Sequence, residues 1–180
     1  MWAAILLFGL WIGREPLLVA GGRLFYPFPF RDAVVAAADH SEVDPLLVVT
    51  VMREESGFSP EARSRAGALG LMQLMPVTAR WIATKEAIPA GDLHDPVYNI
   101  RLGTAYLAYL QRQFDDDLER VLAAYNGGEG NVARWKDLSE AFPETRQYVR
   151  RTINTYGVYQ WLYGSEFTRM DASATVRPER

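Results

Sequence analysis

Apolar residues recur at helical spacing along most of this chain, and no segment shows the strict alternation that is typical of a strand. Asp-Pro pairs begin two of the predicted helices, because aspartate is a good N-cap and proline suits the first helical position. We expect a mainly helical single domain with at most a small β-hairpin between Phe58 and Met75. The predicted helices cover residues 31–40, 44–57, 77–87, 95–114, 118–125 and 131–136, with a last helix that begins at Pro143.

The helix predicted from residue 44 is apolar around its whole circumference from Leu46 to Met52, which indicates that it is buried. It ends on two acids, Glu54 and Glu55, just before Gly57. The negative end of the helix dipole, partial burial and the neighbouring acid all favour a raised pKa. A carboxyl group of that kind suits a general acid near neutral pH. The alternative is a pair of solvated glutamates, and the helix alone does not decide which glutamate faces a cleft.

Composition narrows the chemistry that this chain can perform. Among its 180 residues are no cysteine and only two histidines, His40 and His94, so disulfides, thiolate catalysis and a cysteine- or histidine-rich metal centre are not expected. The net charge is −3 and no basic stripe is present, which argues against a nucleic acid partner. Catalysis would therefore depend on carboxylates, amides, hydroxyls and tyrosines, with no metal and no organic cofactor.

The first 20 residues are apolar except for Arg14 and Glu15, with Trp2 and Trp11 placed as in a membrane interface. We interpret residues 1–20 as a signal-anchor or export segment, and a buried terminal helix is the alternative. Residues 21–30 contain two glycines and two prolines and are expected to be an irregular connector. The domain is expected to span residues 31–164, followed by a disordered polar tail over residues 165–180.

Four segments occur in order, each at a predicted helix end or loop: ESGF from residue 55, GALGLMQLMP from 67, AAYNGGEGNV from 123 and PETRQYV from 143. Together they resemble the soluble lytic murein transglycosylase family, the SLT domain, over residues 28–163. The resemblance implies a goose-type lysozyme-like α-domain that cleaves the MurNAc–GlcNAc bond of peptidoglycan. In that family the glutamate before the serine is catalytic, which selects Glu55 and leaves Glu54 as a bystander.

The same resemblance implies a set of residues that bind substrate or support the acid: Ser56, Met72, Gln73, Tyr125, Asn126 and Tyr148. Met72 and Met75 could equally be fillers of the core, and for Met75 we prefer that interpretation. Gly127 and Glu129 depart from the family pattern, which usually has alanine and proline at these places.

A single acid is enough for the reaction that the resemblance implies. Glu55 would protonate the glycosidic oxygen and then, as a base, deprotonate the muramic C6 hydroxyl, which closes a 1,6-anhydro ring. Asp92 and Asp95 lie in a loop that nothing in the sequence directs toward the site. A hydrolysing muramidase and a non-catalytic glycan-binding or wall-scaffold protein stay open as alternatives. The expected partners are peptidoglycan glycan strands and cell-wall or secretion machinery, at an extracytoplasmic location in the cell envelope.

Overall fold

The computed structural model describes the backbone of residues 18–174 and the side chains of residues 18–167. It divides into a larger unit, residues 29–157, and a smaller unit formed by the described parts of residues 1–28 and 158–180. Most of the predicted membrane anchor, residues 1–17, lies outside the described residues. Among the helices that are described, none combines the length and apolar character needed to cross a membrane.

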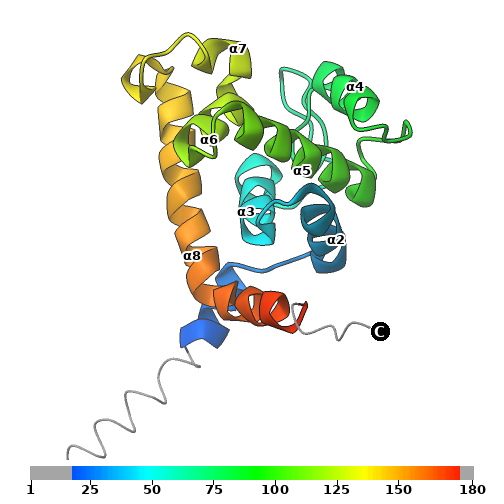
Figure 1. Ribbon diagram of the computed structural model, residues 1–180, viewed down its shortest axis with the longest axis vertical. Helices are drawn as coiled ribbons and strands as arrows, with labels where there is room; N and C mark the ends of the chain where they lie inside the picture. Colours follow the sequence, from blue (N-terminus) through cyan, green and yellow to red (C-terminus); the bar gives the residue numbers. More distant parts are fainter. Residues whose placement is uncertain (1–17, 175–180) are drawn as a thin grey trace, which may run out of the picture. The chain divides into compact units, whose positions relative to one another are not determined.

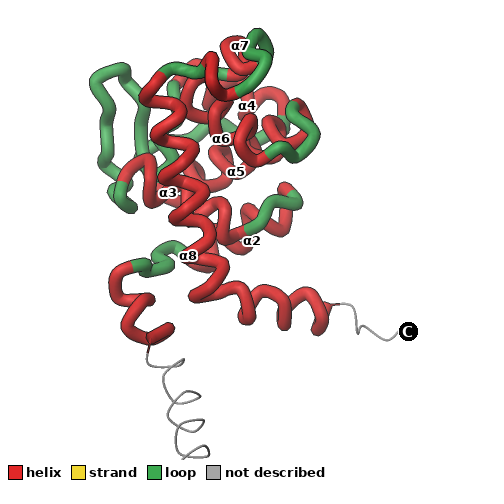
Figure 2. The backbone as a smooth tube through the Cα atoms, turned by 90° about the vertical axis from the view of Figure 1, so that its left-hand side faces the viewer, coloured by secondary structure: helices red, strands yellow, loops and turns green. Residues whose placement is uncertain are grey.

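The larger unit is helical, and within its residues no strand forms (Figures 1 and 2). The sequence permitted a small β-hairpin between Phe58 and Met75. The structure has two isolated bridges there, Arg63 with Leu69 and Leu69 with Leu74, and no hairpin. In chain order the elements are α2 (Arg31–Ser41), α3 (Pro45–Ser56), α4 (Pro76–Lys85), α5 (Pro96–Gln113), α6 (Leu118–Gly127), α7 (Glu129–Val132), the 3₁₀ helix η1 (Leu138–Glu140) and the first half of α8 (Pro143–Ala174).

Helix α5 packs against α2, α4 and α6, and α2 in turn packs against α3 (Figure 1). Helix α3 is buried on every side, since no residue from Leu46 to Met52 is more than 3% exposed. Its ends form as the sequence predicts. The Asp44 carboxylate accepts a hydrogen bond of 2.7 Å from the Leu46 amide, and Gly57 ends the helix with a φ of 59°.

Helix α8 is tied to both ends of α3. The Tyr156 hydroxyl donates to the Asp44 carboxylate at the start of α3. At the other end, Glu54 binds Arg151 and Thr155 of α8. These contacts fix the orientation of the helix that also carries Tyr148.

One helix prediction within this unit was displaced along the chain. Helix α7 spans residues 129–132 and not 131–136, because Gly128 turns the backbone with a φ of 86° and its carbonyl accepts from the amides of Asn131 and Val132. The helix therefore starts directly after that glycine and ends before Trp135.

In the smaller unit two predictions were wrong. Residues 18–25 are helical although the segment from residue 21 was expected to be irregular. The two prolines fall after this helix, and Gly22 allows close contact with Leu162, since a Cβ there would lie 2.7 Å from its Cδ2. Residues 165–174 of the tail are not irregular either, because α8 continues to Ala174. Its extension is stabilised by an ion pair of 2.5 Å between Glu166 and Arg23.

Gly103 lies in α5 at a close contact with a side chain of the preceding loop. A Cβ at this position would lie 2.2 Å from the Sδ atom and 2.8 Å from the Cβ atom of Met72. Met72 is fully buried, so it has little room to move. Gly103 therefore seats the loop of residues 67–75 against α5.

Replacing Gly103 by alanine should destabilise the protein because the added methyl group overpacks this contact. We expect the free energy of unfolding to fall by about 1–3 kcal/mol. Gly157→Ala in α8 is the matched control, because a Cβ there meets nothing within 4 Å. That substitution should raise the free energy of unfolding by up to about 1 kcal/mol through helix propensity. Denaturant unfolding of both variants checks the prediction, which fails if Gly103→Ala is as stable as Gly157→Ala.

Candidate active site

Glu55 lies in the last turn of α3, where its carboxyl group is largely enclosed. Burial raises its pKa from 4.5 to about 7, and the neighbouring Glu54 charge contributes in the same direction. Tyr148 and Arg151 act in the opposite direction by stabilising the carboxylate. The raised pKa expected from the sequence is therefore confirmed, and near neutral pH this group can both give and accept a proton.

Two tyrosines from distant parts of the chain flank this carboxyl group. Tyr148 of α8 is buried, and within the described residues its hydroxyl makes no hydrogen bond of regular geometry. It lies near enough to Glu55 to lower the pKa of the acid. Tyr125 of α6 donates a hydrogen bond of 2.9 Å to the Met72 carbonyl. Burial first, and the Glu55 charge second, raise the pKa of both tyrosines, so both stay protonated.

Glu54 is held away from this group by α8. Its carboxylate accepts a hydrogen bond of 2.7 Å from the Thr155 hydroxyl and one of 3.2 Å from Arg151 Nε. Adjacent residues on a helix point about 100° apart, so one acid can bind α8 while the other faces the tyrosines. The structure thus gives the two glutamates different environments, which the helix pattern alone did not resolve.

Ser56 holds the segment that follows. Its hydroxyl lies 2.7 Å from the Leu71 carbonyl and 3.1 Å from the Met52 carbonyl, and it accepts from the Phe58 amide at 3.1 Å. The Ser56 hydroxyl therefore makes its hydrogen bonds with the protein backbone. Ser56 therefore positions the loop of residues 67–75 beside the end of α3, where the sequence had suggested contact with the site or substrate.

Asn99 is a supporting residue that the sequence analysis missed. It is fully buried in α5, and its Oδ1 accepts from the Met72 amide at 2.8 Å. Its Nδ2 donates to the carbonyls of Leu69 and Leu93 at 3.1 and 2.8 Å. A lone amide at an apolar position of the predicted helix was the available signal. Asn99, which follows the loop of residues 67–75 in the chain, therefore fixes the same loop as Ser56, which precedes it.

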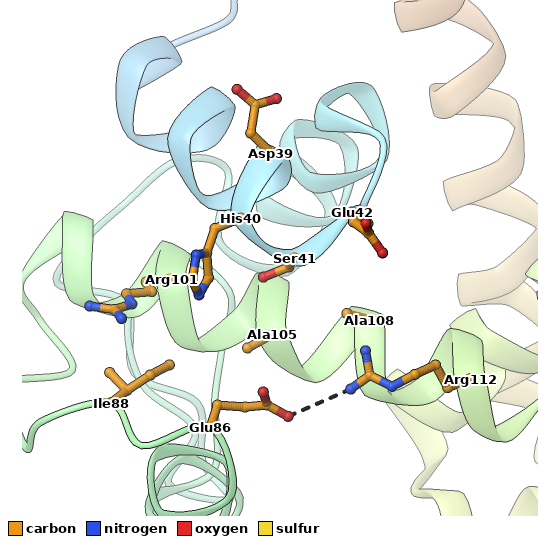
Figure 3. Close-up of a pocket in the computed structure, with 10 residues that line it drawn as sticks. All are labelled: Asp39, His40, Ser41, Glu42, Glu86, Ile88, Arg101, Ala105, Ala108 and Arg112. Carbon is orange, nitrogen blue, oxygen red and sulfur yellow. Dashed lines mark ion pairs between the residues drawn. The ribbon is translucent and has the colours of Figure 1, made fainter.

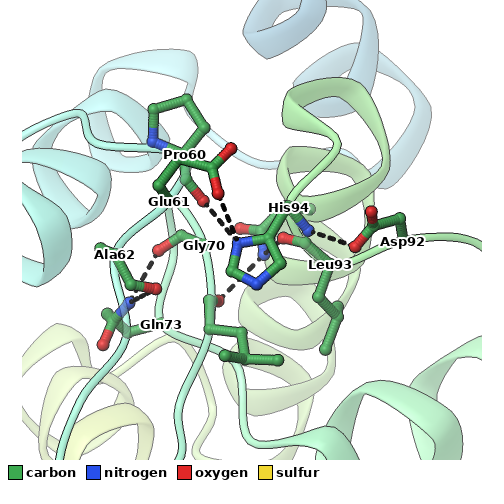
Figure 4. A network of polar contacts seen from close by, with 10 residues as sticks. Pro60, Glu61, Ala62, Gly70, Gln73, Asp92, Leu93 and His94 are labelled. Atoms are coloured by element: carbon green, nitrogen blue, oxygen red, sulfur yellow. Dashed lines mark hydrogen bonds and ion pairs between the residues drawn. The ribbon is translucent and has the colours of Figure 1, made fainter.

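Gln73 has a left-handed backbone, with a φ of 47°, and its side chain folds back on its own loop. The amide Nε2 donates to the Gly70 carbonyl at 2.9 Å and to the Ala62 carbonyl at 3.1 Å (Figure 4). In the same view His94 joins the loop through its Nδ1, 3.1 Å from the Pro60 carbonyl. Gln73 therefore shapes the loop, and only its Oε1 is left to face a ligand.

The two methionines of the loop lie in different environments, and the prediction for one of them was wrong. Met72 is fully buried against Gly103, whereas Met75, interpreted from the sequence as a core filler, is 38% exposed at the start of α4. The prediction for Met75 was wrong because the loop between residues 67 and 75 is irregular, so helical periodicity does not report which side chains face inward. Met75 is therefore the methionine that can contact a bound ligand.

The end of α6 carries the remaining predicted site residue. Asn126 is exposed and follows Tyr125, so its amide is available at the edge of the site. At Gly127, an alanine Cβ would lie 3.0 Å from the Thr145 hydroxyl, and Thr145 is buried in α8. The departure from alanine noted in the sequence thus lets α6 and α8 approach closely.

A separate cavity of about 210 Å³ lies between α2, α5 and the end of α4 (Figure 3). His40, Arg101 and Ala105 line it, and an ion pair of 3.5 Å between Arg112 and Glu86 occupies one side. No residue proposed from the sequence for the active site lines this cavity. Because the cavity is lined by other residues, we assign it no role in the chemistry of Glu55.

Residues 32–148 match the model of the family described as Transglycosylase SLT domain, and the chain belongs to this family. It is 32% identical over 164 residues to the soluble lytic murein transglycosylase of Escherichia coli, a match that covers 82% of this chain and 25% of the relative. It is 35% identical over 168 residues to the membrane-bound lytic murein transglycosylase F of Desulfosudis oleivorans, covering 82% of this chain and 35% of the relative. The chain thus spans about a quarter of the length of the first relatives.

Solved structures agree with this assignment. The 70 kDa soluble lytic transglycosylase of Escherichia coli has a TM-score of 0.73 and 30% identity, covering 79% of this chain and 26% of that chain. An inactive glutamate-to-glutamine mutant of the lytic transglycosylase Slt from Pseudomonas aeruginosa has a TM-score of 0.71 and 34% identity, covering 77% and 25%. The mainly helical, lysozyme-like fold predicted from the sequence is confirmed.

Proposed function

We propose that this protein is a peptidoglycan lytic transglycosylase that cleaves the MurNAc–GlcNAc bond, with Glu55 as the catalytic acid and base. The observation that carries the proposal is the enclosed Glu55 carboxyl group, with a pKa of about 7 and the Tyr148 hydroxyl beside it. Membership of the SLT family supports the assignment. The inactive glutamate-to-glutamine mutant of the related Pseudomonas enzyme supports the choice of a glutamate.

In the first step, protonated Glu55 gives its proton to the glycosidic oxygen while the bond from that oxygen to the muramic C1 breaks. The acetamido group of the substrate stabilises the positive charge at C1, and the Tyr148 hydroxyl stabilises the new carboxylate. In the second step, the C6 hydroxyl of the same sugar attacks C1 and its proton returns to Glu55. The intramolecular attack needs no positioned water, which is consistent with a site built around one acid.

The other predicted site residues then have supporting roles. Tyr125 and Ser56 bind the backbone carbonyls of Met72 and Leu71, so they hold the loop of residues 67–75 next to the acid. The Gln73 side chain stiffens that loop. The exposed Asn126 side chain and the Gln73 Oε1 would bind acetamido or hydroxyl groups of the glycan.

The products distinguish this reaction from hydrolysis on the same fold. We expect mass spectrometry of fragments released from purified peptidoglycan to show 1,6-anhydro-MurNAc ends, each lighter by one water than a reducing end. Incubation in water enriched in oxygen-18 provides the control, because a transglycosylase product acquires no label. Labelled reducing MurNAc ends without anhydro ends would exclude the transglycosylase and leave a muramidase.

We also propose that the protein acts in the cell envelope, outside the cytoplasm, where peptidoglycan glycan strands are its substrate. Residues 31–164 would form the catalytic domain, residues 1–20 the anchor or export segment and residues 165–180 a terminal extension. General wall turnover and local opening of the wall for a secretion apparatus both agree with this location. Membrane fractionation of the protein with and without residues 1–20 tests the anchor, which is excluded if both forms stay soluble.

A further inference from the structure

A continuous row of aromatic rings leads from the candidate site to the surface of α4. The Tyr125 ring beside Glu55 contacts Tyr106, with 5.4 Å between ring centroids. Tyr106 lies parallel to Tyr109 at 6.3 Å, and Tyr109 meets Trp81 edge to face at 4.7 Å. The sequence analysis missed this row because its members come from three helices, α4, α5 and α6.

Exposure of the rings increases from Tyr106 outward. Tyr106 is only 9% exposed, Tyr109 is half-buried and Trp81 is 40% exposed. Met75, at the start of α4, is also exposed. An exposed tryptophan supported edge-on by a tyrosine is a rigid apolar surface with polar groups at its rim, and such a surface suits the flat C–H face of a sugar ring.

Charged groups frame the outer end of this row. The Lys85 ammonium lies 5.4 Å from the Tyr109 ring centroid and 5.9 Å from that of Trp81. The Glu129 carboxylate lies near the Tyr109 hydroxyl. Burial is the largest cause of the raised pKa of that hydroxyl, and Glu129 is the second. In a protein with a net charge of −3, Lys85 supplies a local positive charge for an anionic ligand.

We propose that Trp81 and Tyr109, flanked by Lys85, form an outer subsite that binds a sugar of the glycan strand several units away from the bond that Glu55 cleaves. The sugar ring packs on Trp81, and Lys85 binds the carboxylate that a muramic lactyl group or its peptide carries. This inference rests on the proposed function for the nature of the strand. It adds that binding strengthens with strand length until the outer subsite is filled.

Binding to the full chain in a Glu55→Gln background tests the subsite without cleavage. Peptide-free glycan strands of increasing length are titrated by calorimetry. Trp81→Ala and Tyr109→Ala should each weaken binding of long strands by about tenfold, the effect of losing one aromatic contact, and leave the shortest strands unaffected. Trp161→Ala is the matched control, because Trp161 is another exposed tryptophan, outside the row, and should change neither.

Lys85→Gln tests the charge. It should weaken binding of long muramic strands but not of chitin oligosaccharides of equal length, because chitin lacks the carboxylate. The subsite is excluded if Trp81→Ala binds long strands as tightly as Trp161→Ala, or if it weakens short and long strands equally. These outcomes are independent of whether anhydro ends form, so failure of the subsite and failure of the proposed reaction are distinguishable.

Discussion

Glu55→Gln is expected to lower the rate of fragment release from purified peptidoglycan by about a thousandfold or more, because a proton donor contributes on that order to such reactions. Glutamine has nearly the size of glutamate and keeps the packing at the end of α3. It cannot give a proton to the glycosidic oxygen or take one from the C6 hydroxyl. The loss should therefore appear in kcat at every pH, with the fold intact by circular dichroism.

Glu54→Gln is the matched control, with the same chemical change one residue earlier. Glutamine can still accept from the Thr155 hydroxyl, so α3 and α8 stay joined. Because the Glu54 charge raises the pKa of Glu55, its removal should lower that pKa and reduce activity above pH 7 by a few fold at most. If Glu54→Gln lost as much activity as Glu55→Gln while still folded, Glu55 would not be the sole acid.

The same carboxyl group should make the protein less stable as the pH rises. In the folded state the pKa of Glu55 is about 7, against 4.5 for an exposed carboxyl group. Below about pH 4.5 the group is protonated whether the chain is folded or unfolded. Above about pH 4.5 the carboxyl group ionises in the unfolded chain but stays protonated in the folded one. The free energy of unfolding therefore decreases with pH until the pH passes about 7, where the folded protein ionises too. A shift of this size corresponds to about 3 kcal/mol.

Glu55→Gln removes that penalty. Its free energy of unfolding should match that of the wild type near pH 4 and exceed it by about 3 kcal/mol near pH 8, equivalent to several degrees in Tm. Thermal unfolding of the two proteins over this pH range measures the pKa of Glu55 without any substrate. A constant difference between them at all pH values would show that the carboxyl group is not enclosed as described.

Local signals in the sequence were enough for most helix ends. Asp44 and Gly57 bound α3 because an N-cap and a left-handed glycine act within one turn, and both formed as predicted. The pair of acids followed from the same reasoning. Their division into two roles did not, because Arg151 and Tyr148 lie far away in the chain and reach the end of α3 only through the packing of α8.

Predictions that depended on tertiary contacts fared worse. The burial of Met75 was predicted wrongly because an irregular loop has no period from which burial can be read. The family resemblance implied that Ser56 and Gln73 belong to the site, yet the Ser56 hydroxyl and the Gln73 Nε2 bind backbone carbonyls of the protein itself. Asn99 was missed although it is a lone amide at an apolar position of a predicted helix, because its role depends on three hydrogen bonds to the loop and to Leu93 that only the fold creates.

The separation of Glu55, Tyr125 and Tyr148 along the chain has a consequence for biosynthesis. When α3 has just left the ribosome, Glu55 has been synthesised. Tyr125, Tyr148 and helix α8, which binds Glu54, have not. In such a nascent chain Glu55 is hydrated and titrates like any other glutamate, so it is ionised at neutral pH and cannot donate a proton. The chain acquires this enclosed acid only when α8 has been synthesised and has docked, so the lytic activity that we propose would depend on completing the fold.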